Sequence, residues 1–460
     1  MTLINTRTLT LFFATLSLIL SAFGNETALR RASSLAERIQ ESGLALEIAT
    51  DLTTEIGPRL YGSDSERRAV KWAAKRFEEY GFDKIWTESF PVDRGWERGE
   101  ETASITSPSP QNLVVTALGG SVATPPEGIE AEITLFKSID DLKAQPEGSL
   151  DGKIAVVTQP MGIGQYGKIS GPIRGNGPSE AAKRGAVAFL MRSAGTSNHR
   201  FAHTGATRYQ KDVPRIPAAA LSVPDAQQLD RLNDRFDSVR IRLVLTPKQL
   251  GTVTSQNLIA EITGSEKPEE IVLLGAHIDS WDLGTGAIDD GAGVGVVMAA
   301  TKLIRELPTP PKRTIRVVLF GAEEIGIYGG SFYVENNRED LDRHIIAAEA
   351  DAGQGPIHTF NLGVGDPLEP TLSVIRDALK TLGVQPGRAK SRGGPDIAPM
   401  ANLGVPVAGL DMFTEDYFDL HHTPNDTIDK IEPNRINQSA AVYVTFAYLA
   451  SELGGYYRAK

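Results

Sequence analysis

The sequence predicts an α/β fold in which helices sandwich a mostly parallel, mixed β-sheet, with a β-rich domain inserted into the chain. From Asn257 onward, short apolar runs alternate with helical stretches, as is typical of strands in a covered parallel sheet. Between residues 93 and 252, short apolar runs are instead separated by Pro and Gly turns. The length of 460 residues also exceeds that of one ordinary core, which allows a second unit.

The composition limits the possible classes of protein. Apolar residues make up 41% of the chain and charged residues 23%, as in globular proteins. The 58 acidic residues exceed the 47 basic ones, so we expect no nucleic-acid partner, because nucleic-acid-binding surfaces are basic. The absence of Cys excludes disulfides, thiolate metal ligands and cysteine catalysis. No G-x-S-x-G motif occurs, which argues against a serine hydrolase.

The chain begins with a predicted targeting segment. Arg7 is the only charged residue among the first 25, and an apolar stretch from Leu9 to Phe23 follows it. Because small residues end this stretch, we expect a secretory signal peptide at residues 1–24. The alternative is an uncleaved anchor, although the stretch is shorter than the roughly 20 apolar residues of a membrane helix. We therefore expect an exported protein, periplasmic or secreted, with no stable membrane span after signal cleavage.

Two helices are predicted after the signal segment and before the inserted domain. Leu44, Ile48 and Leu52 recur at every fourth position, and Pro58 closes that run. The amphipathic stretch 66–80 predicts the second helix.

The rest of the chain divides into two patterns. Within the insert, strands are predicted at 113–118, 129–136, 154–158 and 186–191, and a helix at 178–184. In the C-terminal part, continuous apolar runs predict buried strands at 271–275, 314–320, 345–348 and 405–410. Helices are predicted there at 293–307, 368–382 and 436–453. We therefore expect a main domain of residues 25–92 and 253–460, interrupted by an insert of residues 93–252.

Acidic residues and histidines follow the ends of the four predicted buried strands. The carboxyl ends of parallel strands lie along one edge of a sheet, where ligands bind, so we expect these side chains to converge. The residues concerned are His277, Asp279, Asp289, Asp290, Glu323, Glu324, Asp351, His421 and His422.

These residue types together predict a metal site. Neutral imidazole and carboxylate are the usual ligands of Zn²⁺ in hydrolytic sites. Two metal ions about 3.5–4 Å apart need a bridging carboxylate, and an unligated carboxylate can act as general base. Each residue alone is compatible with a helix N-terminus, a turn or an exposed loop. Their common position after successive apolar strands favours a shared functional site.

Four segments carry a resemblance to a known family. In order and spacing, GAHIDSWDLGTGAIDDGAG, FGAEEIGIYGG, AEADAG and HHTPNDT resemble the motifs of the co-catalytic di-zinc aminopeptidases. This family includes aminopeptidase Y and glutamate carboxypeptidase II, and the HIDSWDLGTGAIDDG block resembles in particular its carboxypeptidase Q branch. The resemblance covers nearly all of the mature chain.

The resemblance implies two Zn²⁺ per chain. In this family His277 and Asp351 would bind one zinc ion, Glu324 and His422 would bind the other, and Asp289 would bridge them. The position directly before the Thr of the HHTPNDT motif matches the family's ligand, which favours the second histidine of that motif over the first.

The resemblance also implies two residues that act without binding metal. Glu323 would be the general base that activates a water bridging the two ions, and Asp279 would orient the imidazole of His277. The peptide bond between Asp289 and Asp290 would be cis, as is frequent in this family.

The resemblance implies that the insert is a protease-associated domain and that the protein is a homodimer. His203 lies in an insert loop from which it could reach the cleft and contact a substrate carboxylate, and Asp396 matches a segment near the site in relatives. We expect His199, His344 and His358 at the surface.

The expected function is hydrolysis of short, unsubstituted peptides, most of all dipeptides, by a metallo-exopeptidase. The alternatives are an aminopeptidase that acts on longer peptides, a single-zinc enzyme similar to glutaminyl cyclases, and a non-catalytic binding protein on the same fold. The complete ligand set argues against the last two.

Overall fold

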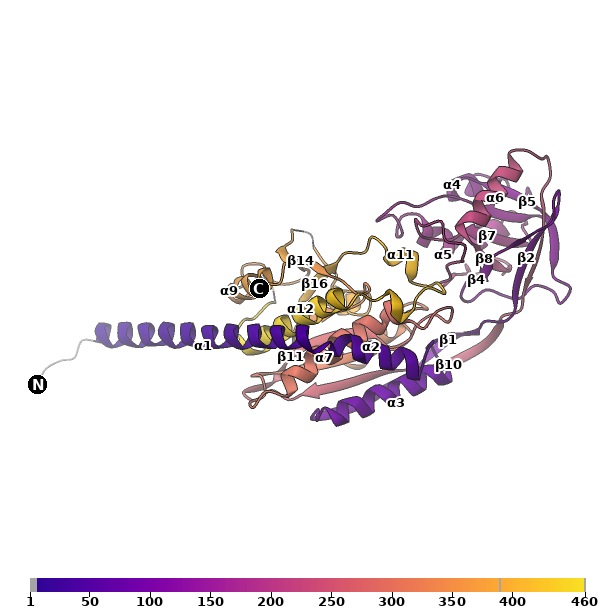
Figure 1. The fold of residues 1–460 in the computed structure, drawn as a ribbon. Helices are drawn as coiled ribbons and strands as arrows, with labels where there is room; N and C mark the ends of the chain where they lie inside the picture. Colours follow the sequence, from indigo (N-terminus) through magenta and orange to yellow (C-terminus); the bar gives the residue numbers. More distant parts are fainter. Residues whose placement is uncertain (1–5, 389, 459–460) are drawn as a thin grey trace, which may run out of the picture.

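The computed structural model describes residues 6–388 and 390–458, which form two mixed β-sheets with helices around them (Figure 1). The main sheet has the strand order β1-β10-β12-β11-β13-β16-β14-β15. In chain order its strands are β1 (Lys84–Glu97), β10 (Lys248–Ile262), β11 (Lys267–His277), β12 (Arg313–Phe320), β13 (His344–Glu349), β14 (Ile357–Leu362), β15 (Gln385–Pro386) and β16 (Val407–Met412).

The four predicted buried strands are the parallel centre of this sheet. The pairs β12–β11, β11–β13 and β13–β16 are parallel. On either side, β10 runs antiparallel to β12, β1 antiparallel to β10, and β14 antiparallel to β16. The prediction of an α/β fold with a mixed sheet is therefore confirmed.

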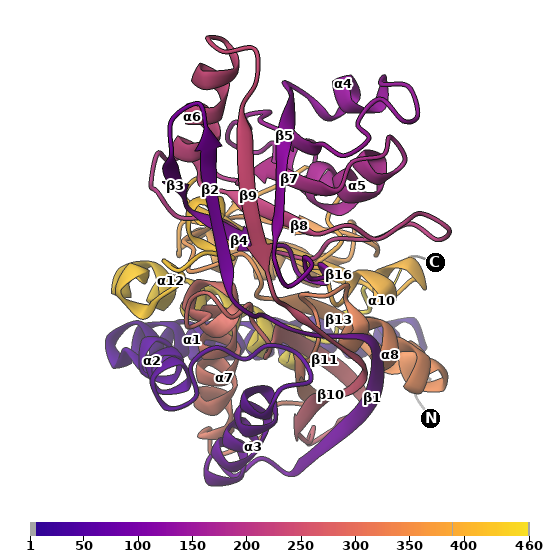
Figure 2. The same ribbon diagram turned by 90° about the vertical axis from the view of Figure 1, so that its right-hand side faces the viewer.

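Helices cover both faces of the main sheet (Figure 2). Successive residues of β11 point to opposite faces, so Val272 and Leu274 belong to one apolar cluster and Leu273 to another. The helices that share the first cluster are α1 (Thr6–Ser42), α2 (Leu44–Glu55), α3 (Asp64–Glu79), α7 (Ala292–Arg305), α9 (Pro370–Lys380) and α12 (Pro433–Glu452). Those that share the second are α8 (Tyr328–Asn336) and α10 (Ala398–Asn402).

A second eight-stranded sheet is built from the part of the chain predicted as the insert. Its order is β3-β2-β9-β5-β6-β7-β8-β4, and β4 returns beside β2, so that the sheet is nearly closed. The strands are β2 (Glu101–Ser107), β3 (Gln111–Leu113), β4 (Val115–Ala117), β5 (Ile129–Phe136), β6 (Ile154–Val157), β7 (Ala188–Arg192), β8 (Ala218–Leu221) and β9 (Arg240–Leu245). The helices α4 (Ile139–Lys143), α5 (Ser170–Ala182) and α6 (Val223–Asn233) lie against it.

The predicted helix at 178–184 is wrong at both ends. Helix α5 begins at Ser170, ends at Ala182 and contains Pro178. Its first turns carry three glycines, which are poor helix formers and hid the helix from sequence analysis. Packing explains one of them, because a Cβ on Gly177 would lie 2.3 Å from the ring of Phe189.

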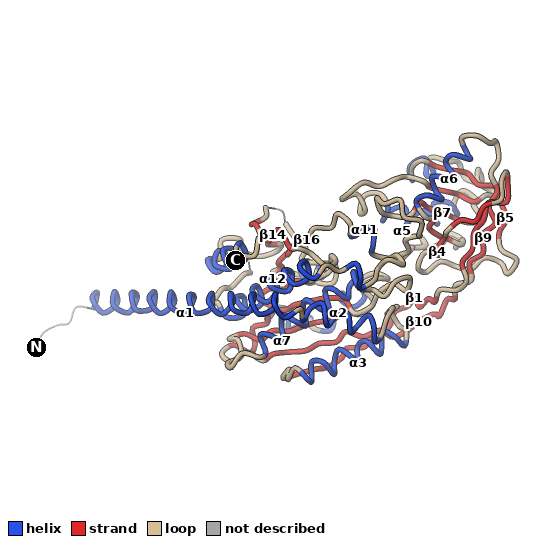
Figure 3. Tube along the Cα trace, in the orientation of Figure 1, coloured by secondary structure: helices blue, strands red, loops and turns tan. Residues whose placement is uncertain are grey.

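The long antiparallel pair β1–β10 connects the two sheets. Val92 faces Val253 across this pair, so the predicted domain boundaries lie inside it and the division of the chain there remains a prediction. One apolar cluster continues across the connection and includes Tyr61 and Trp281 from the main unit and Trp96 from β1. Figure 3 shows loops gathered between the two sheets, where α5 and α11 (Tyr417–Leu420) also lie.

The predicted signal segment is helical from Thr6 onward, where it forms the beginning of α1, and its first five residues lie outside the described residues. This part of α1 extends away from the rest of the protein (Figure 1). Within the described chain, no helix combines the length and the apolar character that a bilayer crossing requires.

Candidate metal centre

The residues predicted to form a metal site converge at the carboxyl edge of the parallel strands. His277 is the last residue of β11, and Asp351 comes two residues after β13. Glu324 follows β12 by four residues, and Asp289 lies in a buried, kinked segment (Ala287–Gly291) that leads into α7. His422 comes two residues after α11. The parallel order of β12, β11 and β13 therefore brings together ligands that are far apart in the sequence.

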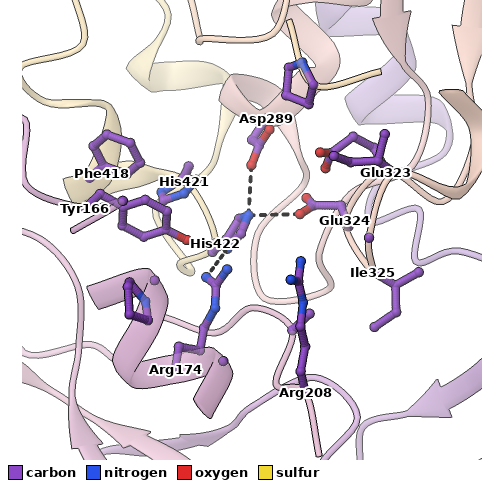
Figure 4. Close-up of a pocket in the computed structure, with 18 of the residues that line it drawn as sticks. Tyr166, Arg174, Arg208, Asp289, Glu323, Glu324, Ile325, Phe418, His421 and His422 are labelled. Atoms are coloured by element: carbon purple, nitrogen blue, oxygen red, sulfur yellow. Dashed lines mark hydrogen bonds and ion pairs between the residues drawn. The ribbon is translucent and has the colours of Figure 1, made fainter. Parts of the chain in front are cut away.

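Asp289 connects the two imidazoles. Its Oδ1 lies 3.1 Å from Nε2 of His277, and its Oδ2 lies 3.1 Å from Nε2 of His422. His277 Nε2 is also 3.6 Å from Oδ1 of Asp351, and His422 Nε2 is 2.9 Å from Oε2 of Glu324. Figure 4 shows Asp289 and Glu324 directed at the same edge of the His422 ring. Each imidazole thus has one carboxylate of its own and shares Asp289.

The opposite nitrogen of each imidazole faces a backbone carbonyl. His277 Nδ1 lies 3.0 Å from the carbonyl oxygen of Asp279, and His422 Nδ1 lies 3.4 Å from that of Thr204. A proton on each Nδ1 can be donated to these carbonyls, so a bound metal ion could take the place of the Nε2 protons that point at the carboxylates. This is the arrangement that a metal-binding histidine requires.

Burial makes the acidic centre costly unless cations are present. The side chains of Asp289, Glu324 and His422 are buried, and burial raises the pKa of Glu324. Hydrogen bonds from both imidazoles outweigh burial at Asp289 and lower the pKa of its carboxyl well below the usual range. Within residues 6–388 and 390–458, no Lys or Arg forms an ion pair with a carboxylate of this centre. The donor set of three carboxylates and two imidazoles therefore fits two zinc ions.

Asp290 is also close to these ligands but has other partners. Its carboxylate accepts hydrogen bonds from the backbone N–H groups of His277 and Gly293, both at 3.1 Å. Donor atoms of Asp290 lie near those of His277 and Asp351, but the backbone bonds leave Asp289 as the better candidate for the shared ligand. The peptide bond between Asp289 and Asp290 is cis, as the family resemblance implies.

Asp279 lies beside His277, as the resemblance implies, but it also contacts other residues. Its Oδ1 is 3.6 Å from His277 Nδ1, farther away than its own carbonyl oxygen. The carboxylate instead accepts the backbone N–H groups of Glu323 at 3.1 Å and Glu324 at 3.3 Å. Ala322, which precedes them, has a left-handed φ of 53°, so the chain turns sharply at this point. Asp279 therefore fixes the backbone of both glutamates.

Glu323 lines a cavity of about 540 Å³ together with Asp289, Glu324, Asp351 and His422. It is only half-buried, and Figure 4 shows its carboxylate near those of Asp289 and Glu324. Burial, together with the neighbouring acidic groups, raises the pKa of Glu323 well above its usual range. It is thus an accessible carboxylate beside the candidate metal ligands.

The remaining predicted site residues lie near the cavity but do not line it. His203 is 2% exposed, and its Nε2 lies 3.1 Å from Nδ1 of His421, so it packs behind the cavity wall. Asp396 is completely buried and accepts the N–H of Gly330 at 2.9 Å through Oδ1. Its Oδ2 has no hydrogen-bond partner in the part of the chain that the structure describes, and burial raises the pKa of this carboxyl well above its usual range.

His344 and His199 were both expected at the surface. His199 is exposed as expected, but His344 is not. His344 is fully buried, with Nε2 at 2.8 Å from the Tyr333 hydroxyl and Nδ1 at 3.1 Å from the Asp340 carbonyl. Burial lowers the pKa of His344 to about 3. His344 is buried because it is the first residue of the buried strand β13, and the expectation of a surface position was wrong.

The sequence does not predict the cavity wall that the insert supplies. Arg174 of α5 lies with Nη1 3.3 Å from Nδ1 of His422, and its guanidinium lies over the ring of Tyr166. Tyr166 stacks on Phe418 of α11, with ring centroids 4.3 Å apart, and Arg208 lines the same cavity. Nothing in the sequence indicates that these residues face the metal ligands, because the contact crosses from one sheet unit to the other.

A mixed α/β sheet that carries two imidazoles and a shared carboxylate at its carboxyl edge defines a metal-dependent hydrolase. Residues 257–447 match the model of peptidase family M28. Carboxypeptidase Q of Mus musculus is 36% identical over 403 residues, which cover 87% of this chain and 84% of that protein. Carboxypeptidase Q of Homo sapiens is 34% identical over 405 residues, with the same two coverages. The chain therefore belongs to peptidase family M28 and is a metallopeptidase.

Solved structures agree with this assignment. The crystal structure of a peptidase M28 precursor from Shewanella amazonensis SB2B has a TM-score of 0.92 and 45% sequence identity, and the match covers 95% of this chain and 99% of that one. The zinc aminopeptidase from Bacillus subtilis has a TM-score of 0.66 at 21% identity, covering 89% of this chain and 95% of that one. At that identity, the second comparison supports the fold alone.

Proposed function

We propose that this protein is a two-zinc exopeptidase that hydrolyses short peptides with a free α-amine, most of all dipeptides. The observation that carries the proposal is the Asp289 carboxylate between the Nε2 atoms of His277 and His422, with 3.1 Å on each side. A carboxylate shared by two imidazoles is the arrangement that a pair of closely spaced metal ions needs. The similarity to carboxypeptidase Q over most of the chain supports the same activity class.

Five residues would hold the two ions: His277, Asp289, Glu324, Asp351 and His422. Zinc bound there would polarise the scissile carbonyl and lower the pKa of a water molecule. The chain itself holds the ligands in place, because the backbone carbonyls of Asp279 and Thr204 fix the orientation of both rings.

Glu323 is the proposed general base and acid. It lines the cavity and has no imidazole or cationic partner among the described residues, so its carboxylate is open to the attacking water. Its Oε atoms would accept the proton of that water and then deliver a proton to the leaving amine. Asp279 supports this transfer, because it holds the backbone N–H of Glu323 at 3.1 Å and so limits the movement of the side chain.

The insert favours short substrates. Tyr166, Arg174 and Arg208 of the insert line the same cavity as the candidate metal ligands and narrow the space beside them (Figure 4). A longer peptide is the second candidate substrate, because a cavity of about 430 Å³ continues past Asp351 and Pro395. An aminopeptidase that acts on longer peptides is therefore the alternative, and the experiment below distinguishes it from a dipeptidase.

The test combines metal content with three substrates. We expect about two zinc ions per chain, hydrolysis of a free dipeptide, no hydrolysis of its N-acetyl derivative, and weak hydrolysis of a free-amine heptapeptide. Asp289→Asn should lower the metal content and activity together, whereas Glu339→Gln on an exposed turn should change neither. Equal cleavage of dipeptide and heptapeptide would favour the aminopeptidase. A reconstituted protein that binds no zinc and cleaves nothing would contradict the proposal.

We extend the proposal to export and assembly. The predicted signal at residues 1–24 would be removed on export, and the protein would form a homodimer. Intact mass of the protein recovered from the periplasm or medium tests the first statement, and light scattering of that protein tests the second.

A further inference from the structure

Arg59 is a buried cation whose partners are backbone carbonyls. Its side chain is completely buried, and within the described residues no carboxylate lies at ion-pair distance from it. Its guanidinium donates instead to four carbonyl oxygens: Nε to Ile278 at 2.7 Å, Nη1 to Gly57 at 3.0 Å and to Thr285 at 2.8 Å, and Nη2 to Gly286 at 2.8 Å. These bonds offset the cost of removing the guanidinium from water, because its buried donors are satisfied.

The carbonyls that Arg59 binds belong to the segments of two candidate metal ligands. Ile278 directly follows His277, and Gly286 precedes Asp289 by three residues. Gly286 has a left-handed φ of 64°, and a Cβ there would lie 2.8 Å from Nη2 of Arg59, so the backbone approaches the guanidinium closely. One side chain therefore holds the end of β11 and the segment before Asp289 at a fixed separation.

Asp426 holds the other side of the segment before the shared ligand. Its Oδ1 accepts the backbone N–H of Ile288 at 2.5 Å, and its carbonyl oxygen accepts that of Thr285 at 2.8 Å. Thr285 lies between Asp426 and Arg59, because its own carbonyl accepts from Nη1 of Arg59. Asp426 also follows His422 by four residues in the HHTPNDT motif. Arg59 and Asp426 together thus connect the segments that carry all three of these ligands.

Arg59 also brings positive charge close to the acidic centre. Burial lowers the pKa of Arg59, and the negative charges of Asp426, Asp279, Asp290 and Asp289 oppose that lowering. A guanidinium combines this charge with a planar fork of donors, so it can bind carbonyls of two segments at once. A lysine would supply the charge without the fork. The two contributions can therefore be separated by substitution.

We propose that Arg59 is a positioning residue of the two-metal centre, which fixes the segments of His277 and Asp289 so that Asp289 can serve both ions. This inference rests on the proposed function, because it needs two bound zinc ions. Arg59 lines neither the cavity of about 540 Å³ nor that of about 430 Å³, so it acts through the ligands and not on the substrate. Residues that hold metal ligands in place typically contribute 10- to 100-fold to metal affinity.

Arg59→Lys tests this role. Equilibration of the zinc-loaded protein with a chelator of known affinity measures zinc binding, and we expect the variant to bind zinc about 10- to 100-fold more weakly than wild type. At saturating zinc, kcat for a dipeptide should fall by about 10- to 100-fold, because the ligands are displaced. KM should stay near wild type, because the cavity wall is unchanged. Arg68→Lys, the same substitution at an exposed arginine of α3, should change none of these values.

Asp426→Ala tests the same arrangement from the other side, because it removes the acceptor of the Ile288 N–H and leaves Arg59 in place. We expect weaker zinc binding and a lower kcat here too, and this variant decides the question if Arg59→Lys does not fold. A folded Arg59→Lys with the zinc affinity and kcat of wild type would overturn the inference, whatever its Tm, and so would wild-type values in Asp426→Ala. A wild-type protein that binds no zinc would instead contradict the proposed function.

Discussion

Glu323 differs from the other acidic residues of the cavity wall. Asp289, Glu324 and Asp351 each lie beside an imidazole, whereas Glu323 has no ion-pair partner in the described chain. A carboxylate that binds no metal can be replaced without removing a ligand. The proton-transfer step can therefore be separated from metal binding by one substitution.

We predict that Glu323→Gln retains the zinc content of the wild type and lowers kcat by about 10²- to 10⁴-fold, which is the usual contribution of a general base. KM should change little, because the metal ligands remain. Elemental analysis and steady-state kinetics on the same preparation provide the measurement. Loss of zinc together with activity would show that Glu323 is a ligand. Glu339→Gln, which replaces an exposed glutamate that lines neither cavity, is the matched control.

The convergence of His277 and Asp351 could be predicted because each follows a strand whose apolar run is plain in the sequence, whereas the division of the residues into metal ligands is what the family resemblance implies. His277 ends β11, and Asp351 comes shortly after β13, so the parallel order alone brings them together. The opposite wall could not be predicted in this way. Tyr166 and Arg174 lie in the insert, and no local pattern specifies which face of the insert meets the main sheet.

At the level of elements, the strands that could be predicted from the sequence are those buried on both faces of the sheet. All eight residues of β12 are buried, and its last four residues, 317–320, form a continuous apolar run. The first part of β10 is exposed and polar, and β14 is only partly buried, so neither strand was predicted. Edge and antiparallel strands need less apolar sequence, because one face or one end remains in solvent.

Helix α3 begins with a buried acidic cap. Ser63 accepts the backbone N–H of Glu66 at 3.1 Å, and Glu66 accepts that of Gly62 at 2.6 Å, a variant of the capping box in which the glutamate bonds the residue before the N-cap. The Glu66 carboxyl also accepts the hydroxyl of Ser255. Glu66 is 1% exposed, and burial, assisted by the charge of Asp279, raises its pKa to about 8. The protonation state of this cap therefore changes with pH.

We predict that Glu66 makes the protein less stable as pH rises from about 4.5 to about 8. In this window the unfolded chain releases the proton that the folded chain retains, so the free energy of unfolding falls with pH. The slope from this group is at most about 1.4 kcal/mol per pH unit. Glu66→Gln cannot ionise, so its free energy of unfolding relative to wild type should increase with pH. Urea denaturation at pH 5, 6, 7 and 8 measures this.

The control for this prediction is Glu78→Gln, which replaces an exposed glutamate on the same helix. Its stability relative to wild type should be independent of pH over the same range. A difference between Glu66→Gln and wild type that stays constant from pH 5 to 8 would show that Glu66 is ionised in the folded protein throughout.

At the scale of the whole molecule, the cavity is completed only when the two sheet units are in contact. Gly119 of the insert packs against Trp281 so closely that a Cβ would lie 1.9 Å from the indole. The backbone N–H of Trp281 in turn donates to Oε1 of Glu324 at 3.2 Å. The backbone N–H of Thr204 donates to the carbonyl of His422 at 2.9 Å. The insert therefore contacts the metal centre directly as well as forming the far wall of the cavity.

Asp419 is a second connection between the units, and it can be removed without touching a ligand. Its carboxylate accepts the N–H of Ser197 at 3.0 Å and the hydroxyl of Thr196 at 2.9 Å, both from an insert loop. Asp419 belongs to α11, which directly precedes the two histidines of the HHTPNDT motif. These bonds therefore hold the insert loop against the segment that carries His422.

We predict that Asp419→Ala raises KM for dipeptides by about 5- to 30-fold, because hydrogen bonds to a charged group contribute about 1–2 kcal/mol to the closed arrangement. The metal ligands are unchanged, so kcat and zinc content should stay near wild type. Limited proteolysis within residues 195–205 should become faster as the loop is released. Glu415→Ala, an exposed neighbour, should show none of these effects. A fall in kcat with unchanged KM would instead mean that the Asp419 contact positions His422 rather than the insert.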